Sequence, residues 1–212
     1  MMWFLLEALA AYLIGSVSGS LVVGKFRHVD IRESGSGNAG GTNAFRTQGL
    51  RFALGVVLID VGKGALAAGL VPWLGGALAG PHAAPAWAPL ACGFMAVVGH
   101  CFPVWHGFRG GKGAATAVGA LLVIQPIVLI PMILTWLFVL VVTGWVGLAT
   151  IISALTLIPA FAWWDGPGPE FTFAIVLAAF IVFMHRSNIR KLIAGTENRF
   201  ERIRIVNWFG RD

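Results

Sequence analysis

Three stretches of this sequence combine glycines with side chains that can hold a phosphate group. In the central stretch the basic residues Arg109 and Lys112 stand among glycines, Gly110, Gly111 and Gly113. Glycine lets the backbone adopt positive φ and approach an anion closely, and the basic side chains supply charge. A helix predicted to begin near Ala114 would direct its unpaired N–H groups at the same anion. The alternative is a tight turn whose charges mark the cytoplasmic face of a membrane.

The first stretch lies between residues 30 and 46 and matches G-x-G-x-x-G over residues 35–40. It follows an apolar segment that fits a membrane span and not a strand, so a dinucleotide site fails its structural context. Its backbone donors, hydroxyls, amides and one arginine suit a phosphate or a developing oxyanion, whereas the alternative is a flexible polar linker. The candidate residues are Gly35, Ser36, Gly37, Asn38, Gly40, Thr42, Asn43 and Arg46.

The third stretch, residues 185–197, ends a long apolar segment and joins basic residues to amide and carboxyl side chains. Its candidate residues are His185, Asn188 and Glu197.

Composition places all three stretches in a membrane protein. The mean hydropathy is +0.82 and only 11% of the residues are charged, against about 25% in an ordinary soluble domain. Membrane spans would use most of the 212 residues, so we expect one integral-membrane domain, residues 1–212.

The distribution of charge argues against a nucleic-acid partner despite the net charge of +6. All but one of the 15 Lys and Arg residues fall into three clusters, residues 25–51, 109–112 and 186–211. Cytoplasmic loops are enriched in Lys and Arg, so all three clusters are predicted to lie inside. The basic tail, Arg199 to Arg211, is expected to contact anionic lipid head groups.

Apolar segments and loop charges together predict an all-α protein with seven transmembrane helices, the N-terminus outside and the C-terminus cytoplasmic. The spans are expected at about residues 3–23, 52–74, 89–104, three within 114–164, and 171–184, with short helices or loops at the cytoplasmic face. Within the second span, Asp60 and Lys63 are expected to face the bundle interior, either as a structural ion pair or in support of the site.

This topology brings the three polar stretches to one face of the membrane. Loose backbone is not tolerated in lipid, so the loops must pack together or line one aqueous cleft. Two phosphate-type loops on one face indicate two phosphates, or one phosphate and a phosphorylated leaving group.

The motifs also carry a family resemblance. They are Gly35-Ser36-Gly37-Asn38 with Thr42-Asn43 and Arg46, Gly99-His100 with Phe102-Pro103 and Gly110-Gly111-Lys112-Gly113, and His185-Arg186 with Asn188-Ile189 and Gly195-Thr196-Glu197. In order and spacing they resemble the bacterial acyl-phosphate:glycerol-3-phosphate acyltransferase family, often called PlsY, over almost the whole chain. Asp60 with Lys63-Gly64 is similar to the family's second span, and Gly41 stands where the family more often has alanine.

The resemblance implies transfer of a fatty acyl group from acyl phosphate to the sn-1 hydroxyl of glycerol 3-phosphate, giving lysophosphatidic acid and phosphate in phospholipid synthesis. It implies no acyl-CoA or acyl carrier protein as donor and no cofactor. The expected location is the bacterial cytoplasmic (inner) membrane, with the active site facing the cytoplasm. Expected partners are acyl phosphate, glycerol 3-phosphate, membrane lipids and a soluble acyl-phosphate-forming enzyme.

Matching the motifs to the chemistry gives each stretch an expected role. Lys112 and its neighbouring glycines, helped by His185 and Asn188, would hold the phosphate of glycerol 3-phosphate, and Glu197 would orient its neighbours. The first stretch would hold the acyl phosphate and the oxyanion. The candidate catalytic residues are Ser36, Arg46, Lys112, His185 and Asn188. Either the glycerol hydroxyl attacks the acyl carbon directly, which we favour because the donor is already activated, or Ser36 or His185 is acylated first.

Two other classes of function fit the sequence less well. An anion transporter would place polar elements near the bilayer midplane and show an internal repeat, whereas the three polar stretches here are predicted to lie at one face of the membrane. A metal-dependent phosphotransferase would need clustered aspartates, whereas Asp30, Asp60, Asp165 and Asp212 are scattered. We therefore expect no metal.

Overall fold

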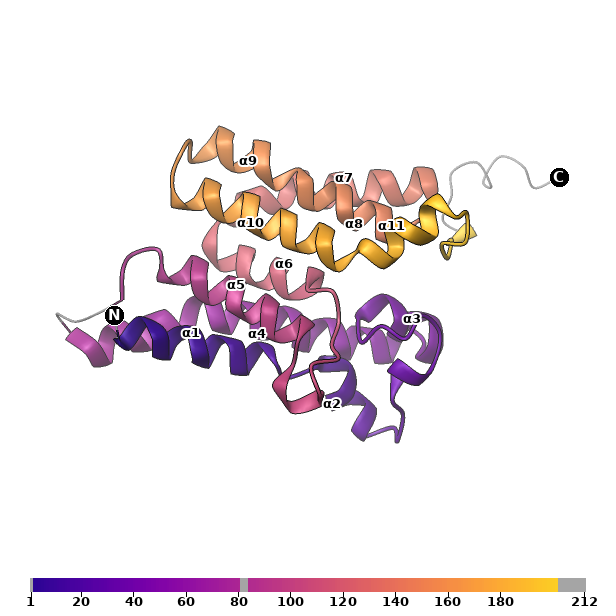
Figure 1. Cartoon of the computed structure of the whole chain (residues 1–212), viewed down its shortest axis with the longest axis horizontal. Helices are drawn as coiled ribbons and strands as arrows, with labels where there is room; N and C mark the ends of the chain where they lie inside the picture. Colours follow the sequence, from indigo (N-terminus) through magenta and orange to yellow (C-terminus); the bar gives the residue numbers. More distant parts are fainter. Residues whose placement is uncertain (1, 81–83, 202–212) are drawn as a thin grey trace. The chain divides into compact units, whose positions relative to one another are not determined.

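The structure is a computed structural model that describes residues 2–80 and 84–201, and within them every regular element is a helix (Figure 1). The helical prediction is thus confirmed. The chain divides into two compact units, residues 1–126 and 127–212, which are described separately below. The single-domain assignment is not tested by this division and stays a prediction.

The first unit contains every element up to the central stretch and the helix after it. These are α1 (Met2–Gly15), α2 (Gly19–Lys25), η1 (Ile31–Glu33), α3 (Gly41–Gln48), α4 (Leu50–Ala79), α5 (Ala88–Cys101), η3 (Val104–His106) and α6 (Ala114–Ile124). Helix α6 begins at the residue predicted for it. Instead of one span over residues 3–23, α1 and α2 meet at 47°. The polar first stretch is only partly a loop, because it contains η1 and α3.

Helix α4 is the central element of this unit, because it contacts α1, α2, α3, α5 and α6. Figure 1 shows α1, α4 and α5 running side by side. Several glycines let helix backbones touch. A Cβ on Gly64 would overlap the carbonyl oxygen of Thr116 in α6, and one on Gly119 would overlap that of Val61. Small residues at such contacts are a general device of membrane helix packing.

The second unit is a bundle of shorter apolar helices. After η4 (Pro126–Val128) come α7 (Leu129–Thr143), α8 (Val146–Leu155), α9 (Leu157–Trp164), α10 (Pro169–Met184) and α11 (Arg186–Ile193). Helix α7 packs on α8, α10 packs on α8 and α9, and α11 packs on α8. Helix α11 leaves α10 at 55°, where the third polar stretch begins.

Four helical segments in the described residues are long and apolar enough to cross a membrane, and each bent pair adds one more, giving up to six. The predicted 114–164 region does divide into α6, α7 and the α8–α9 pair, but α6 has only 11 residues. The count of seven spans and the orientation of the termini therefore stay predictions. The part of the basic tail beyond residue 201 lies outside the described residues.

The contact between α4 and α6 gives a first prediction. We expect Gly64→Ala to lower the free energy of unfolding by about 1–3 kcal/mol and the melting temperature by roughly 5 °C. The reason is that the new methyl group meets backbone atoms of α6, which cannot rotate away as a side chain can. The control is Gly62→Ala in the same helix, where a Cβ would meet nothing within 4 Å. Thermal unfolding of the detergent-solubilised protein measures both, and equal melting temperatures for the two variants would contradict the packing described.

Candidate active site

The first stretch is organised by the side chain of Asn43. Its Oδ1 accepts a hydrogen bond from the backbone N–H of Ser36 at 2.9 Å. Its Nδ2 donates to the carbonyl oxygens of Ile31 at 2.9 Å and Ser34 at 3.1 Å. Asn43 is 1% exposed, so these bonds are shielded from water. The amide that we expected to bind substrate thus holds the loop backbone in place.

Two glycines complete this loop. Gly35 and Gly37 have φ of 60° and 71°, in the left-handed region that glycine adopts without strain. The turn leaves Ser36 exposed and Asn38 partly buried. Helix α3 then begins at Gly41, so Thr42 lies in its first turn and Arg46 in its last.

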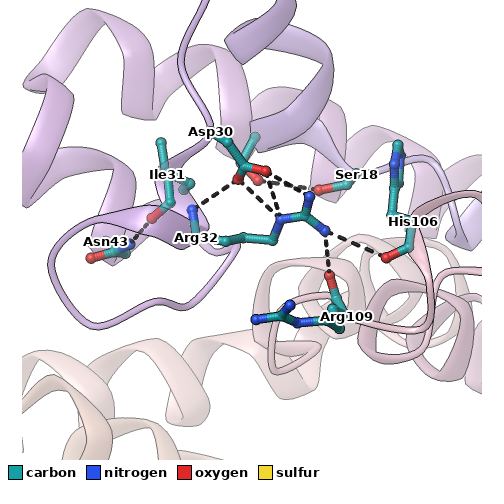
Figure 2. A network of polar contacts seen from close by, with 8 residues as sticks. Ser18, Asp30, Ile31, Arg32, Asn43, His106 and Arg109 are labelled. Atoms are coloured by element: carbon teal, nitrogen blue, oxygen red, sulfur yellow. Dashed lines mark hydrogen bonds and ion pairs between the residues drawn. The ribbon is translucent and has the colours of Figure 1, made fainter.

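Arg32 ties the first stretch to the central one, as Figure 2 shows. Its Nε and Nη2 donate to the carboxylate of Asp30, with Nη2 to Oδ2 at 2.6 Å. Its Nη1 donates to the carbonyl oxygens of His106 at 3.4 Å and Arg109 at 3.3 Å. Residues more than 70 positions apart are therefore held side by side.

The hydrogen bonds from Arg32 hold the pKa of Asp30 below its ordinary value of 3.8, although partial burial opposes the shift. The same carboxylate caps η1 by accepting from the backbone N–H of Arg32 at 2.9 Å. Asp30 is therefore a structural acid that stays charged at neutral pH.

The central stretch folds back on the end of α5. The N–H of Gly111 donates to the carbonyl of His100 at 3.1 Å, and that of Gly110 donates to the carbonyl of Cys101 at 3.3 Å. A Cβ on Gly110 would overlap the carbonyl oxygen of His100, and one on Gly111 would overlap its imidazole. Gly113, with φ of 86°, is the N-cap of α6.

The loop between the end of α5 and the start of α6 is anchored to α1. The hydroxyl of Tyr12 donates to the carbonyl of Phe102 at 2.8 Å, and the indole N–H of Trp105 donates to that of Leu13 at 3.3 Å. Lys112 is partly buried within this anchored loop.

Asp60 and Lys63 face the interior of the first unit, as predicted. Their side chains form an ion pair of 2.9 Å and are 1% and 4% exposed. The Nδ1 atom of His100 lies 2.8 Å from Lys63 Nζ. This contact links His100, a residue of the central motif, to the buried pair.

The third stretch belongs to the second unit. Nδ2 of Asn188 donates to Oε1 of Glu197 at 2.9 Å, the contact that the predicted orienting role of Glu197 requires. A Cβ on Gly147, near the start of α8, would meet Nδ2 of Asn188 at 2.7 Å. Nδ1 of His185 donates to the carbonyl of Ile181 at 2.8 Å, since a carbonyl oxygen can only accept.

The chain beyond Glu197 is pinned to the turn between α7 and α8. Arg199 donates to the carbonyl of Thr143 at 2.9 Å and stacks 4.3 Å above the ring of Trp145.

The predicted site residues form two groups, one in each unit. The first and central stretches adjoin in the first unit, and the residues of the third adjoin in the second. The roles assigned to them stay predictions.

Two residues that shape the site, Arg32 and His100, were not among the site residues predicted from the sequence. Arg32 was counted only as part of a basic cluster, although Asp30 two positions before it was a signal for a local ion pair. His100 lies within the central motif, but its partners Asp60 and Lys63 are distant in sequence.

Comparisons with known proteins agree with one another. Residues 5–195 match the family model described as glycerol-3-phosphate acyltransferase. A glycerol-3-phosphate acyltransferase of Symbiobacterium thermophilum is 39% identical over 91% of this chain and 92% of its own length. That of Gloeobacter violaceus is 41% identical over 89% and 90%.

Solved structures extend the similarity to three dimensions. The crystal structure of PlsY, an integral membrane glycerol 3-phosphate acyltransferase, in its glycerol 3-phosphate form matches with a TM-score of 0.83 and 32% identity. The match covers 98% of this chain and 99% of that one. The lysophosphatidic acid form gives the same TM-score over 96% and 98%.

The role of Asn43 gives the second prediction. We expect Asn43→Asp to lower the free energy of unfolding by about 2–3 kcal/mol, because a carboxylate cannot donate to the carbonyls of Ile31 and Ser34. Gln48→Glu, the same amide-to-acid change at an exposed position of α3, is the control. Melting temperatures of the two variants decide the point, and a loss no larger in Asn43→Asp than in the control would contradict it.

The third prediction concerns pH. The lowered pKa of Asp30 means that its ion pair stabilises the fold above the unfolded-state value near 3.8 and that this contribution disappears as pH falls through the folded-state value. Asp30→Asn should therefore be less stable than the parent by about 1 kcal/mol at pH 7, and the difference should shrink as pH falls below 3.8. Melting temperatures from pH 7 to pH 3 measure it, beside Glu33→Gln. A difference that does not change with pH would contradict this account.

Proposed function

The chain belongs to the glycerol-3-phosphate acyltransferase family, and from that premise we propose that it transfers a fatty acyl group from acyl phosphate to the sn-1 hydroxyl of glycerol 3-phosphate. The products are lysophosphatidic acid and inorganic phosphate. The observation that carries this proposal is the pair of glycine-containing loops that Arg32 ties together. Two adjacent loops with exposed backbone and basic side chains suit two phosphorylated substrates better than one.

The central loop is the proposed site for the phosphate of glycerol 3-phosphate. Lys112 supplies charge, and Gly110 and Gly111 beside it fold the loop onto the end of α5 through hydrogen bonds to the carbonyls of Cys101 and His100. The α6 N-terminus follows directly and adds unpaired N–H groups and a favourable helix dipole.

The first loop is the proposed site for the acyl phosphate. Asn43 fixes the backbone around Ser36, whose exposed hydroxyl and neighbours Asn38 and Thr42 supply donors for phosphate and for the oxyanion. Arg46, one helical turn beyond Thr42, supplies the positive charge.

The proposed reaction is direct attack. The glycerol hydroxyl oxygen bonds to the acyl carbon, the bond from that carbon to the phosphate oxygen breaks, and phosphate leaves with the electron pair. The hydroxyl proton passes to a phosphate oxygen of a substrate. Acyl phosphate is a mixed anhydride with a good leaving group, so positioning and charge stabilisation supply the catalysis without a strong base.

The third stretch contributes His185, Asn188 and Glu197 to the proposed function as further phosphate ligands and their support. Because Nδ1 of His185 donates to the carbonyl of Ile181, its Nε2 can donate to a phosphate oxygen only in the imidazolium form. Glu197 fixes the amide of Asn188 through their hydrogen bond.

The proposed setting is the bacterial cytoplasmic membrane, with the site facing the cytoplasm. The acyl chain would lie between helices and reach the site from the inner leaflet. Basic residues on the cytoplasmic side would contact lipid head groups and a soluble enzyme that forms the acyl phosphate.

The fourth prediction tests the reaction and its central residue. Purified, detergent-solubilised protein given palmitoyl phosphate and glycerol 3-phosphate, without metal or CoA, should release phosphate and form lysophosphatidic acid. Lys112→Ala should lower kcat/KM about 100-fold or more, because it removes the charge opposite a phosphate. Lys25→Ala, at the exposed end of α2, is the control and should leave the rate within about twofold of the parent.

Three outcomes would contradict parts of this proposal. Product from palmitoyl-CoA but not from palmitoyl phosphate would overturn the donor. An acyl-enzyme trapped on Ser36 or His185 after mixing with palmitoyl phosphate alone would overturn direct attack. Equal rates for Lys112→Ala and Lys25→Ala would remove Lys112 from the site.

A further inference from the structure

A cluster of ionisable side chains lies buried behind the central loop. Asp60, Lys63 and His100 are 1%, 4% and 4% exposed, and they come from the middle of α4 and the end of α5. Burying ionisable groups is costly unless they are paired and hydrogen-bonded. The contacts within the cluster offset part of that cost, while Oδ2 of Asp60 makes no hydrogen bond to the described residues.

The three N–H bonds of the Lys63 ammonium match three acceptors. Nζ lies 2.7 Å from the carbonyl of Val17, 2.9 Å from Oδ1 of Asp60 and 2.8 Å from Nδ1 of His100. An ammonium group has no lone pair, so Nδ1 of His100 must accept. With Lys63 charged, His100 is neutral with its proton on Nε2, and the three side chains together carry no net charge; the same Nδ1 atom lies 3.4 Å from Oδ1 of Asp60.

One side of the cluster serves the break between α1 and α2. The carbonyl of Val17 accepts from Lys63, and the N–H of Gly19 donates to Oδ1 of Asp60 at 3.1 Å. These are backbone groups at the break, and Asp60 and Lys63 satisfy both of them. Repair of the broken span therefore does not require His100.

The other side of the cluster contacts the central loop. The imidazole of His100 fills the space where a side chain at Gly111 would stand, with Nε2 nearest, while its carbonyl accepts from the N–H of Gly111 at 3.1 Å. His100 thus contacts Gly111 through both its ring and its backbone. Lys112 is the next residue, so the position of the ring sets the position from which Lys112 extends.

We propose that His100 is a positioning residue for the glycerol 3-phosphate site, held by Asp60 and Lys63 and acting through Gly111 on Lys112. The inference deepens the proposed function and rests on it, because it takes the central loop as the phosphate site. His100 does not touch the substrate. Its loss changes the affinity of the loop for glycerol 3-phosphate and not the handling of the acyl donor.

The test separates the two sides of the imidazole. In His100→Asn, the amide oxygen stands near the place of Nδ1 and keeps an acceptor for Lys63, while the part of the ring beside Gly111 is removed. Gly111→Ala leaves the ring intact but forces it away from the loop. The double variant gives the new methyl the space that the ring occupied.

The fifth prediction is that each single variant raises the KM and the Kd for glycerol 3-phosphate about tenfold or more, with kcat and the KM for palmitoyl phosphate within about threefold of the parent. In the double variant the two effects should not add, and its Kd should match that of His100→Asn within about threefold. Steady-state kinetics and calorimetric titration of glycerol 3-phosphate into each purified protein measure these quantities.

Two controls account for stability. Glu7→Gln removes a different buried carboxyl, on α1 against Gly75, and Gly76→Ala adds a methyl where a Cβ would meet nothing within 4 Å. Both should leave the affinity for glycerol 3-phosphate unchanged. If His100→Asn does not fold, Gly111→Ala alone decides, because it leaves Asp60, Lys63 and His100 in the chain.

The outcomes distinguish this inference from the proposed function. Additive effects in the double variant, or lower melting temperatures with an unchanged Kd, would overturn the positioning role while the reaction stands. If the parent binds glycerol 3-phosphate but does not use palmitoyl phosphate, the proposed acyl donor is wrong. The Kd values for glycerol 3-phosphate would still test the positioning role of His100. A parent that binds no glycerol 3-phosphate would overturn both.

Discussion

A break in a helix that faces lipid must be repaired by protein atoms, because hydrocarbon offers no hydrogen bonds. In this chain the break between α1 and α2 is repaired by Asp60 and Lys63, which take up the N–H of Gly19 and the carbonyl of Val17. Without the break, α1 would continue straight and α2 could not turn by 47° to lead into the first polar loop. The same buried pair holds His100, which backs the central loop. One polar repair therefore sets the geometry of both loops.

The sequence predicted the features that depend on local pattern. Long apolar segments marked the helices, Gly113 and the apolar run after it marked the start of α6, and an i, i+3 acid–base pair inside a span implied an inward-facing contact. It did not predict the break in the first span, because the groups that stabilise it lie 41 and 46 residues away. The link from Arg32 to the central loop spans 77 residues and was hidden for the same reason.

The glycines illustrate a related limit. From sequence alone they all looked like places where backbone could approach a phosphate. The structure separates them by cause: Gly35 and Gly37 turn the chain at positive φ, whereas Gly110 and Gly111 leave room for the carbonyl and the ring of His100. The two kinds of glycine lie in equivalent-looking motifs, and only their neighbours in space distinguish them. Asn43 follows the same rule, since its amide serves the loop itself.

The pairing of Arg32 with Asp30 has a consequence for turnover. Its guanidinium is neutralised by a carboxylate from its own loop while it holds the carbonyls of His106 and Arg109. An arginine without that acid would be drawn toward every phosphate dianion that arrived, and the tie between the loops would loosen as each ligand bound. Because Asp30 already neutralises the charge of Arg32, the hydrogen bonds that hold the two loops together do not depend on whether a ligand is bound. In the proposed reaction, phosphorylated ligands would therefore bind and leave without competing for the hydrogen bonds that hold the two loops together.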